Sequence, residues 1–212
     1  MSENSFCIED SFFSSPITDS IKQRIWNKSY KTDSNYDLSN LRYLTVLHYT
    51  FEQTICKGEL IVNKRIAALT LDIFRELFES KYPIQQICLV DDFDADDDKS
   101  MAANNSSAFN YRFIDSTTIL SNHSEGLAID INPLYNPYIK EVNGRIRILP
   151  AEGACYADRT QNHPYFIRKG DVCYNAFISR GFSWGGDWED SKDYQHFEYG
   201  MRKETPYESD CI

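Results

Sequence analysis

Four polar residues in the C-terminal half of the chain have the types and spacing of a metal-dependent hydrolytic site. His123 and Asp130 stand at the two ends of the stretch HSEGLAID, with Gly126 between them. His196 ends the run GFSWGGDWEDSKDYQH, and Asp193 lies shortly before it. A catalytic zinc site takes three protein ligands from His, Asp, Glu or Cys and leaves a fourth position open for water. His123, Asp130 and His196 supply such a set.

The chemistry that suits these residues is hydrolysis of a peptide or amide bond. Zinc lowers the pKa of a bound water to about 7 and polarises a carbonyl group. A neighbouring carboxylate, here Asp193, can accept the water's proton and pass it to the leaving amine. A single histidine is more often an ordinary core or surface residue, and this is our interpretation of His48 and His163. The joint pattern of two histidines and two aspartates favours the metal site.

Short strands are expected to position the candidate ligands. Residues 127–132, LAIDIN, alternate large aliphatic and other side chains, which predicts a half-buried strand with Asp130 on the face opposite the aliphatics. Gly126 allows a sharp turn before this strand, so that both ligands of the stretch can reach one ion. Residues 194–199, YQHFEY, predict a final strand, and residues 87–92, ICLVDD, predict another.

Two helices are expected from apolar spacing and capping residues. In residues 65–82 apolar side chains recur at helical spacing, and Pro83 lies just beyond their end. A second helix is expected to begin after Asp171 as N-cap and to run to Arg180, with Gly181 as the left-handed residue that follows.

The chain is expected to form one core with an N-terminal extension. Residues 1–40 are rich in Ser, Asn, Asp and Lys with isolated aromatic residues, which predicts irregular chain or short helices packed on the core. Residues 41–212 are predicted to form the catalytic domain. The acidic run DDFDADDD, residues 91–98, is interpreted as a solvated loop, because Lys99 and Asn105 occupy the glycine and glutamate positions of a calcium loop.

Composition excludes several classes of partner. The formal net charge is −10, from 32 acidic and 22 basic residues, so the surface is expected to repel nucleic acid. No apolar run approaches the ~20 residues that span a bilayer, and the N-terminal residues lack the pattern of a signal peptide. The protein is therefore expected to be kept inside the cell, exported by another route, or present as a trimmed form. A monomer is expected.

Cysteine spacing does not indicate a metal or redox motif. The six cysteines are widely scattered and include no C-x-x-C pair, which favours free thiols. Disulfides stay open as an alternative outside the cell, with Cys155 and Cys173 the nearest pair in sequence.

Two motifs resemble a known family of enzymes. The patterns S-x-H-x-x-G-x-A-x-D and G-F-x-W-G-G-D-W…D-x-x-H-F-E are similar to those of the zinc D-alanyl-D-alanine carboxypeptidase and L-alanyl-D-glutamate peptidase family, which includes VanY-type enzymes and phage endolysins. The resemblance covers roughly residues 85–200. It implies an α+β fold in which a small antiparallel sheet, flanked by helices, carries the zinc ligands and an open cleft receives an extended peptide.

The resemblance also implies roles for individual residues. His123, Asp130 and His196 match the three ligands of one zinc ion, and Asp193 matches the general base. Aspartate rather than glutamate at the base position favours the L-alanyl-D-glutamate branch. Arg112 matches an arginine that holds the substrate carbonyl or its oxyanion, although an ion pair with a nearby aspartate is the equal alternative.

Further substrate-binding residues are implied at the cleft. Ser121 matches the family's serine, which orients a ligand or the substrate; a turn serine is the alternative. Trp184, Asp187 and Trp188 match one wall of the cleft, with packing favoured for Trp184. Asp187 is a candidate partner for a metal-bound histidine, a role that such sites usually fill.

The expected function is hydrolysis of peptidoglycan stem peptides or muropeptides, either by removing a terminal D-alanine or by cutting the L-Ala–D-Glu bond. Such an enzyme acts at the cell wall if it is exported or released by a phage. The alternatives are a non-catalytic zinc-binding recognition module and a hydrolase of another amide. Asp193 argues against the recognition module, because a purely structural zinc site gains nothing from a base beside an open position.

Overall fold

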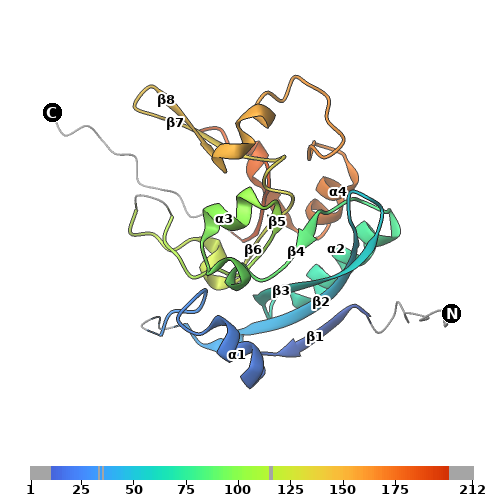
Figure 1. Cartoon of the computed structure of the whole chain (residues 1–212), viewed down its shortest axis with the longest axis vertical. Helices are drawn as coiled ribbons and strands as arrows, with labels where there is room; N and C mark the ends of the chain where they lie inside the picture. Colours follow the sequence, from blue (N-terminus) through green and yellow to red (C-terminus); the bar gives the residue numbers. More distant parts are fainter. Residues whose placement is uncertain (1–10, 33, 35, 115–116, 201–212) are drawn as a thin grey trace.

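The fold combines short helices with small sheets, which confirms the expected α+β class. The computed structural model describes residues 11–32, 34, 36–114 and 117–200 (Figure 1). Within them, no helix is long and apolar enough to cross a bilayer. The α-helices of this part of the chain are α1 (Asp19–Ile25), α2 (Ala67–Glu79), α3 (Asp97–Ala102) and α4 (Val172–Ile178).

A three-stranded antiparallel sheet forms one side of the molecule (Figure 1). It has the order β1-β2-β3, with β1 at Phe13–Pro16, β2 at Leu41–Tyr49 and β3 at Ile55–Asn63. The sequence motifs did not predict this sheet. Most of β2 is buried or half-buried on both faces, so its residues lack the alternation of apolar and polar side chains that identifies a strand exposed on one face.

Helix α2 covers this sheet and confirms the helix expected within residues 65–82. It packs on β2 and also contacts α4. Its inward face is fully buried at Ile73, Phe74 and Leu77, as the helical spacing of these residues requires. The second expected helix is α4, whose N-cap Asp171 accepts a hydrogen bond from the backbone N–H of Tyr174 at 2.7 Å.

A second small antiparallel sheet holds Asp130 and His196, two residues of the expected site. Its order is β6-β11-β9, with β6 at Ala128–Asp130, β11 at His196–Tyr199 and β9 at Phe182–Trp184. Asp130 of β6 lies directly opposite His196 of β11. The strands predicted at residues 127–132 and 194–199 are therefore present and are neighbours, although β6 has only three residues and is buried on both faces rather than half-buried.

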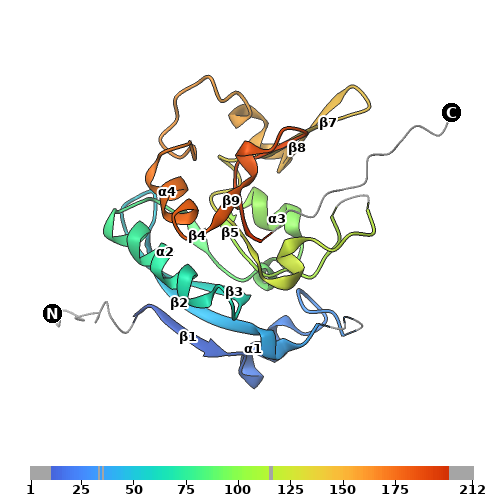
Figure 2. The ribbon, with the colours of Figure 1, turned by 180° about the vertical axis from the view of Figure 1, so that it is seen from behind.

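A third sheet connects a long hairpin to the same region. Its order is β10-β7-β8, with β10 at Lys192–Asp193, β7 at Tyr138–Val142 and β8 at Arg145–Leu149. The β7–β8 hairpin projects from the end of the molecule opposite α1 (Figure 2). β10 pairs with the base of the hairpin, which places the backbone of Asp193 in this sheet.

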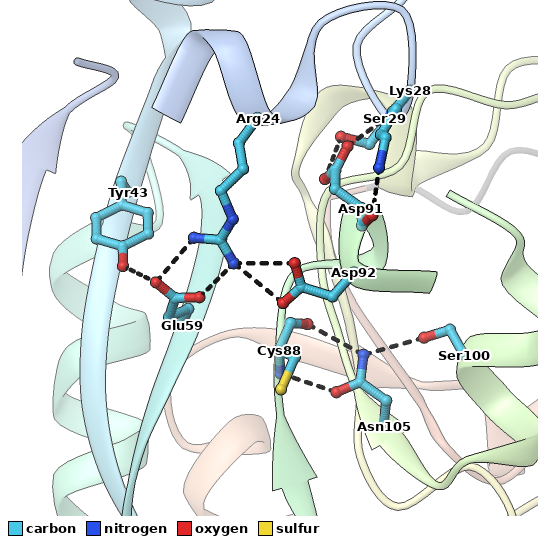
Figure 3. Close-up of polar contacts among 10 residues, drawn as sticks. All are labelled: Arg24, Lys28, Ser29, Tyr43, Glu59, Cys88, Asp91, Asp92, Ser100 and Asn105. Carbon is cyan, nitrogen blue, oxygen red and sulfur yellow. Dashed lines mark hydrogen bonds and ion pairs between the residues drawn. The ribbon is translucent and has the colours of Figure 1, made fainter. Parts of the chain in front are cut away.

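The N-terminal segment is part of the fold rather than a loose cover. β1 completes the first sheet, and α1 buries Ile25 completely. Arg24 of α1 forms ion pairs with Glu59 of β3 at 2.7 Å and with Asp92 at 3.0 Å (Figure 3). Buried Asp91 accepts hydrogen bonds from both the backbone N–H and the hydroxyl of Ser29. The prediction of irregular chain or short helices missed β1, and the division at residue 40 stays a prediction.

The strand expected at residues 87–92 is wrong over most of its length. Only Gln86–Ile87 forms a strand, β4, which pairs in parallel with β5 (Asn105–Ser106). The side-chain amide of Asn105 then bonds both the N–H and the carbonyl of Cys88, in place of further strand pairing (Figure 3). A 3-10 helix, η3 (Val90–Phe93), follows, and in it Asp91 and Asp92 contact the N-terminal segment.

The acidic run contributes ion pairs to the fold. Besides Asp92, three of its carboxylates bind cations within 3.2 Å: Asp94 pairs with Lys28, Asp96 with Lys99 and Asp97 with Arg112. The interpretation of the run as a purely solvated loop is therefore too simple.

The cysteines in the described part of the chain are free thiols at positions 56, 88, 155 and 173. The favoured interpretation is confirmed for these residues, and the Cys155–Cys173 alternative is wrong. Cys7 and Cys211 lie outside the described residues.

Candidate metal centre

The three candidate ligands converge in the folded chain. Their ligand atoms all lie within 4.8 Å of one another, and all three residues are buried. His123 Nε2 is 3.2 Å from both His196 Nδ1 and Asp130 Oδ2. His196 Nδ1 is 2.9 Å from Asp130 Oδ1. Among the described residues, this is the group of His, Asp, Glu and Cys side chains whose geometry suits a metal ion.

A short helical turn positions His123. It lies in the 3-10 helix η4 (Asn122–Glu125), whose N-cap Ser121 accepts a hydrogen bond from the N–H of His123 at 3.3 Å. The ring Nδ1 lies 2.5 Å from the carbonyl oxygen of Ala108. Because a carbonyl only accepts hydrogen bonds, this nitrogen carries the proton, and the Nε2 lone pair is directed at Asp130 and His196.

A buried carboxylate orients His196 in the opposite tautomer. His196 Nε2 is 3.3 Å from Glu198 Oε2, which also accepts a hydrogen bond from the side-chain amide of Asn122 at 2.5 Å. Glu198 follows two residues after His196 on the same strand face and is 2% exposed. An ionised carboxylate accepts a hydrogen bond from the Nε2–H group, so Nδ1 is the nitrogen available to a metal.

The electrostatics of the centre favour positive charge. Burial lowers the pKa of His196, but hydrogen bonds to Asp130 and Glu198 outweigh it and raise the pKa to about 10. Burial raises the pKa of Asp130, but the rings of His123 and His196 outweigh it and hold the pKa well below its usual value. Three carboxylates, those of the buried Asp130 and Glu198 and of the half-buried Asp193, lie around two imidazole rings, which is an arrangement suited to a divalent cation.

Asp193 lies beside the centre and is held there by a close backbone contact. A Cβ atom at Gly185 would come within 2.7 Å of the Asp193 Cβ, so only glycine fits at this position. The Oδ1 atom of Asp193 is buried and has no hydrogen-bond partner among the described residues. A buried acceptor of this kind is expected to bind water or a ligand.

Burial raises the pKa of Asp193 to about 7. The charges of Asp130 and Glu198 raise it as well, whereas those of His196 and Arg112 lower it. A carboxylate with a pKa near the working pH is an effective general base, because it is both ionised and basic enough to take a proton. The environment of Asp193 therefore suits the role that the sequence predicts.

Both the side chain and the backbone of Arg112 make contacts close to this site. Its guanidinium forms an ion pair with Asp97 at 2.8 Å, which is the second of the two interpretations of this residue. Its backbone N–H donates to the hydroxyl of Ser124 in η4 at 2.9 Å, and its carbonyl accepts from the N–H of Ser121 at 3.0 Å. The catalytic role of Arg112 stays a prediction.

The remaining predicted residues occupy different surroundings. The Trp188 ring lies 5.4 Å from the His196 ring, at the edge of the centre. Trp184 is buried and donates its ring N–H to the carbonyl of Tyr194, which confirms the packing role. The exposed Asp187 forms an ion pair with Lys169 at 2.8 Å.

The partner of a ligand histidine that the sequence placed at Asp187 is instead Glu198. Asp187 lies nine residues before His196 and pairs with the exposed Lys169, whereas Glu198 shares a strand face with His196. The signal was present in YQHFEY, where His196 and Glu198 alternate on one face. Substrate-binding roles for Ser121, Asp187 and Trp188 stay predictions.

The other two histidines lie away from the centre, as expected. His48 is buried with its Nδ1 at 2.8 Å from the carbonyl of Ile84. His163 stacks against Tyr135 with ring centroids 5.0 Å apart.

Gly126 is expected to be essential for the ligand turn. Its φ is +65°, and a Cβ there would meet the backbone N of Asn63 at 2.6 Å. Gly126→Ala is therefore expected to destabilise the fold by about 1–3 kcal/mol and to weaken metal binding. Urea unfolding and metal titration measure the two effects. Gly144→Ala, at φ +72° with open space around it, controls for backbone strain alone; equal metal binding in the two variants would contradict the role of Gly126.

Glu198→Gln is expected to lower metal affinity by about 10- to 100-fold while leaving the fold intact. The amide keeps the size of the side chain but loses the negative charge that orients and polarises the His196 ring. Competition with a chromophoric chelator gives the affinity. Glu52→Gln, at an exposed position, is the matched control. An unchanged affinity in Glu198→Gln would remove Glu198 from the site.

Comparison with known proteins agrees with this geometry. The family model described as D-alanyl-D-alanine carboxypeptidase matches residues 115–199. This range is narrower than the resemblance inferred from the motifs, and it contains the three candidate ligands and Asp193 but not Arg112. No curated protein and no solved structure matches the chain. Over residues 115–199, the chain is therefore similar to the family described as D-alanyl-D-alanine carboxypeptidase.

Proposed function

We propose that the protein is a zinc-dependent peptidase that cleaves a peptide bond in the stem peptides of bacterial peptidoglycan. The observation that carries this proposal is the convergence of His123, Asp130 and His196 beside the half-buried carboxylate of Asp193, within the range matched by a peptidase family. Two imidazole nitrogens and one carboxylate form a ligand set that suits a catalytic zinc ion.

The residues fit such an ion by their proton positions. Hydrogen bonds to Ala108 and Glu198 hold the proton of each ring on the nitrogen away from the centre. His123 Nε2 and His196 Nδ1 are then the nitrogens that can bind the metal ion. Asp130 stays ionised at neutral pH because the two rings lower its pKa. When bound, the ion would polarise the scissile carbonyl and make a water molecule more acidic.

The other residues of the site would then move the proton and hold the substrate. Asp193 would accept the proton of the attacking water at its carboxylate and donate it to the leaving nitrogen as the peptide bond breaks. The guanidinium of Arg112, fixed by Asp97, would stabilise the negative charge that develops on the carbonyl oxygen. The Trp188 ring beside His196 would cover one side of the centre.

Mass spectrometry of purified muropeptides tests this function. The zinc-loaded protein is expected to change their masses, whereas Asp193→Ala is not. Loss of one terminal alanine identifies a carboxypeptidase, and release of the stem after its first L-alanine identifies an endopeptidase. The aspartate at the base position favours the endopeptidase. Intact muropeptides with both proteins would overturn the proposal and favour a recognition module.

A further inference from the structure

We propose that Ser29 and Asp91 act together as positioning residues for the guanidinium of Arg112, so that the N-terminal segment of the chain forms part of the site. This inference rests on the proposed peptidase function, in which Arg112 stabilises the negative charge on the substrate carbonyl oxygen. It adds two residues that lie outside the range matched by the family model. Neither is a candidate metal ligand, and both act through the two segments that hold Arg112.

Ser29 lies at a buried junction between three segments that are far apart in the sequence. Its backbone N–H and its hydroxyl both donate to the carboxylate of Asp91, at 3.0 and 2.8 Å (Figure 3). Its backbone carbonyl accepts a hydrogen bond from the N–H of Tyr111 at 2.8 Å. The exposed fractions of Ser29 and Asp91 are 0% and 3%, so these hydrogen bonds lie in a region of low dielectric constant, where they are strong.

The hydrogen bond to Tyr111 fixes the backbone that carries Arg112. The two residues are consecutive, so their Cα atoms are about 3.8 Å apart. Beyond Tyr111, the backbone N–H of Arg112 donates to the hydroxyl of Ser124 in η4 at 2.9 Å. The backbone at Arg112 is therefore held on one side by the N-terminal segment and on the other side by the turn that carries His123.

Asp91 fixes the segment that holds the side chain of Arg112. It belongs to η3, and six residues later Asp97, the first residue of α3, pairs with the guanidinium at 2.8 Å. The chain between Asp91 and Asp97 is short and hydrogen-bonded to itself, because the N–H of Ala95 donates to the carbonyl of Val90 at 2.9 Å. A displacement of Asp91 is therefore expected to move Asp97 and, with it, the guanidinium.

Apolar packing joins the same three segments. A buried cluster contains Ile25 and Tyr30 of the N-terminal segment, Leu89 just before η3, and Phe109, and Tyr111 packs against it. Protein interiors are close-packed, so such a cluster keeps its segments at fixed separations. The hydrogen bonds of the buried junction then set how these segments are oriented.

The position of the guanidinium bears on the rate as well as on stability. Arg112 Nε is buried and has no hydrogen-bond partner among the described residues, so this donor is available to a substrate oxygen. The charge of Arg112 lowers the pKa of Asp193, which shows that the two groups interact across the site. A donor stabilises an oxyanion only at hydrogen-bond distance, and a displacement of about 1 Å can lower a rate about 10²-fold.

Asp91→Ala tests the inference, with Asp91→Asn as the conservative variant. Alanine removes both oxygens that accept from Ser29. Asparagine keeps the shape and one acceptor oxygen, and the hydroxyl of Ser29 can accept a hydrogen bond from its amide. With a muropeptide that wild type cleaves, Asp91→Ala is expected to lower kcat about 10- to 100-fold with little change in KM. Asp91→Asn is expected to keep most of the wild-type kcat.

A double variant separates positioning from a general loss of stability. Arg112→Gln is expected to lower kcat about 10²-fold, and adding Asp91→Ala to it is expected to have no further effect, because the group that Asp91 positions is already absent. Asp171→Ala is the matched control, since this carboxylate also accepts two hydrogen bonds, from the N–H groups of Arg168 and Tyr174 at the start of α4. It is expected to lower Tm and to keep the wild-type kcat.

NMR spectroscopy of isotope-labelled arginine gives a readout that does not need catalysis. The Nε–H signal of Arg112 is assigned by its loss in Arg112→Gln. It is expected to shift in Asp91→Ala and in Ser29→Ala, but not in Asp171→Ala. Ser29→Ala keeps the backbone hydrogen bond to Asp91, so it is the milder variant and guards against misfolding of Asp91→Ala.

The outcomes distinguish the positioning role from the peptidase function. An Arg112 signal that is unchanged in both Asp91→Ala and Ser29→Ala would overturn the inference. So would a loss of kcat that Asp171→Ala shares, or an effect of Asp91→Ala that is as large in Arg112→Gln as in wild type. If wild type cleaves no muropeptide but the signal shifts in the Asp91 and Ser29 variants alone, the peptidase proposal fails and the positioning of Arg112 stands.

Discussion

Asp193→Asn is expected to lower kcat/KM for a cleaved stem peptide by about 10³-fold, because general base catalysis typically contributes 10²- to 10⁴-fold. Asparagine has almost the same shape but cannot accept a proton from water. The fold is expected to stay intact, because Asp193 Oδ1 makes no hydrogen bond within the described residues. Metal binding is expected to persist, since Asp193 is not one of the three ligands.

The control for this variant is Asp98→Asn, which changes an exposed carboxylate outside the site. The pH profile gives an independent check. Burial raises the pKa of Asp193 to about 7, and a bound cation lowers it, so wild-type kcat/KM is expected to fall as the pH decreases below about 7. An Asp193→Asn enzyme that keeps more than a tenth of the activity would show that another group is the base.

Removal of the metal is expected to abolish activity and to lower Tm. A ligand that binds only the folded state stabilises it by about 2.7 kcal/mol at a concentration one hundred times its Kd. Treatment with a chelator is therefore expected to lower the Tm of wild type, and added Zn²⁺ is expected to restore both Tm and activity. His123→Gln lacks one ligand atom of the three, so its Tm is expected not to respond to zinc.

His163→Gln is the matched control, because His163 lies among aromatic rings away from the centre. Its Tm is expected to respond to zinc as the wild type does. Differential scanning calorimetry with and without zinc measures the response. A zinc response in His123→Gln as large as that of wild type would contradict the proposed ligand set.

The sequence alone determined the local elements that carry the site. The helical spacing in residues 65–82 depends only on apolar residues every three or four positions, so α2 was predictable. Likewise, alternation in LAIDIN predicted β6, and Asp171 predicted the start of α4, although this helix ends at Ile178, two residues before the expected Arg180. Each of these signals acts between residues close in the chain.

The sequence also determined which side chains are brought to the centre, because the spacing of His123, Asp130, Asp193 and His196 follows a specific pattern. The fold then confirmed that the first two and the last converge. The sequence did not predict β2, whose residues lack alternation, and it did not predict that β4 ends early and is followed by a 3-10 helix. Burial on both faces and the distant amide of Asn105 decided these cases.

Only the tertiary structure decided the interactions between residues far apart in the sequence. The pairing of Arg112 with Asp97, and the hydrogen bond by which Asn122 holds Glu198 beside His196, depend on which strands and loops become neighbours. The raised pKa of Asp193 depends on burial by the completed core. Periodicity and helix capping depend on residues that are close in the sequence. The burial and the electrostatic environment of a site depend on segments that are far apart in the sequence and become neighbours on folding.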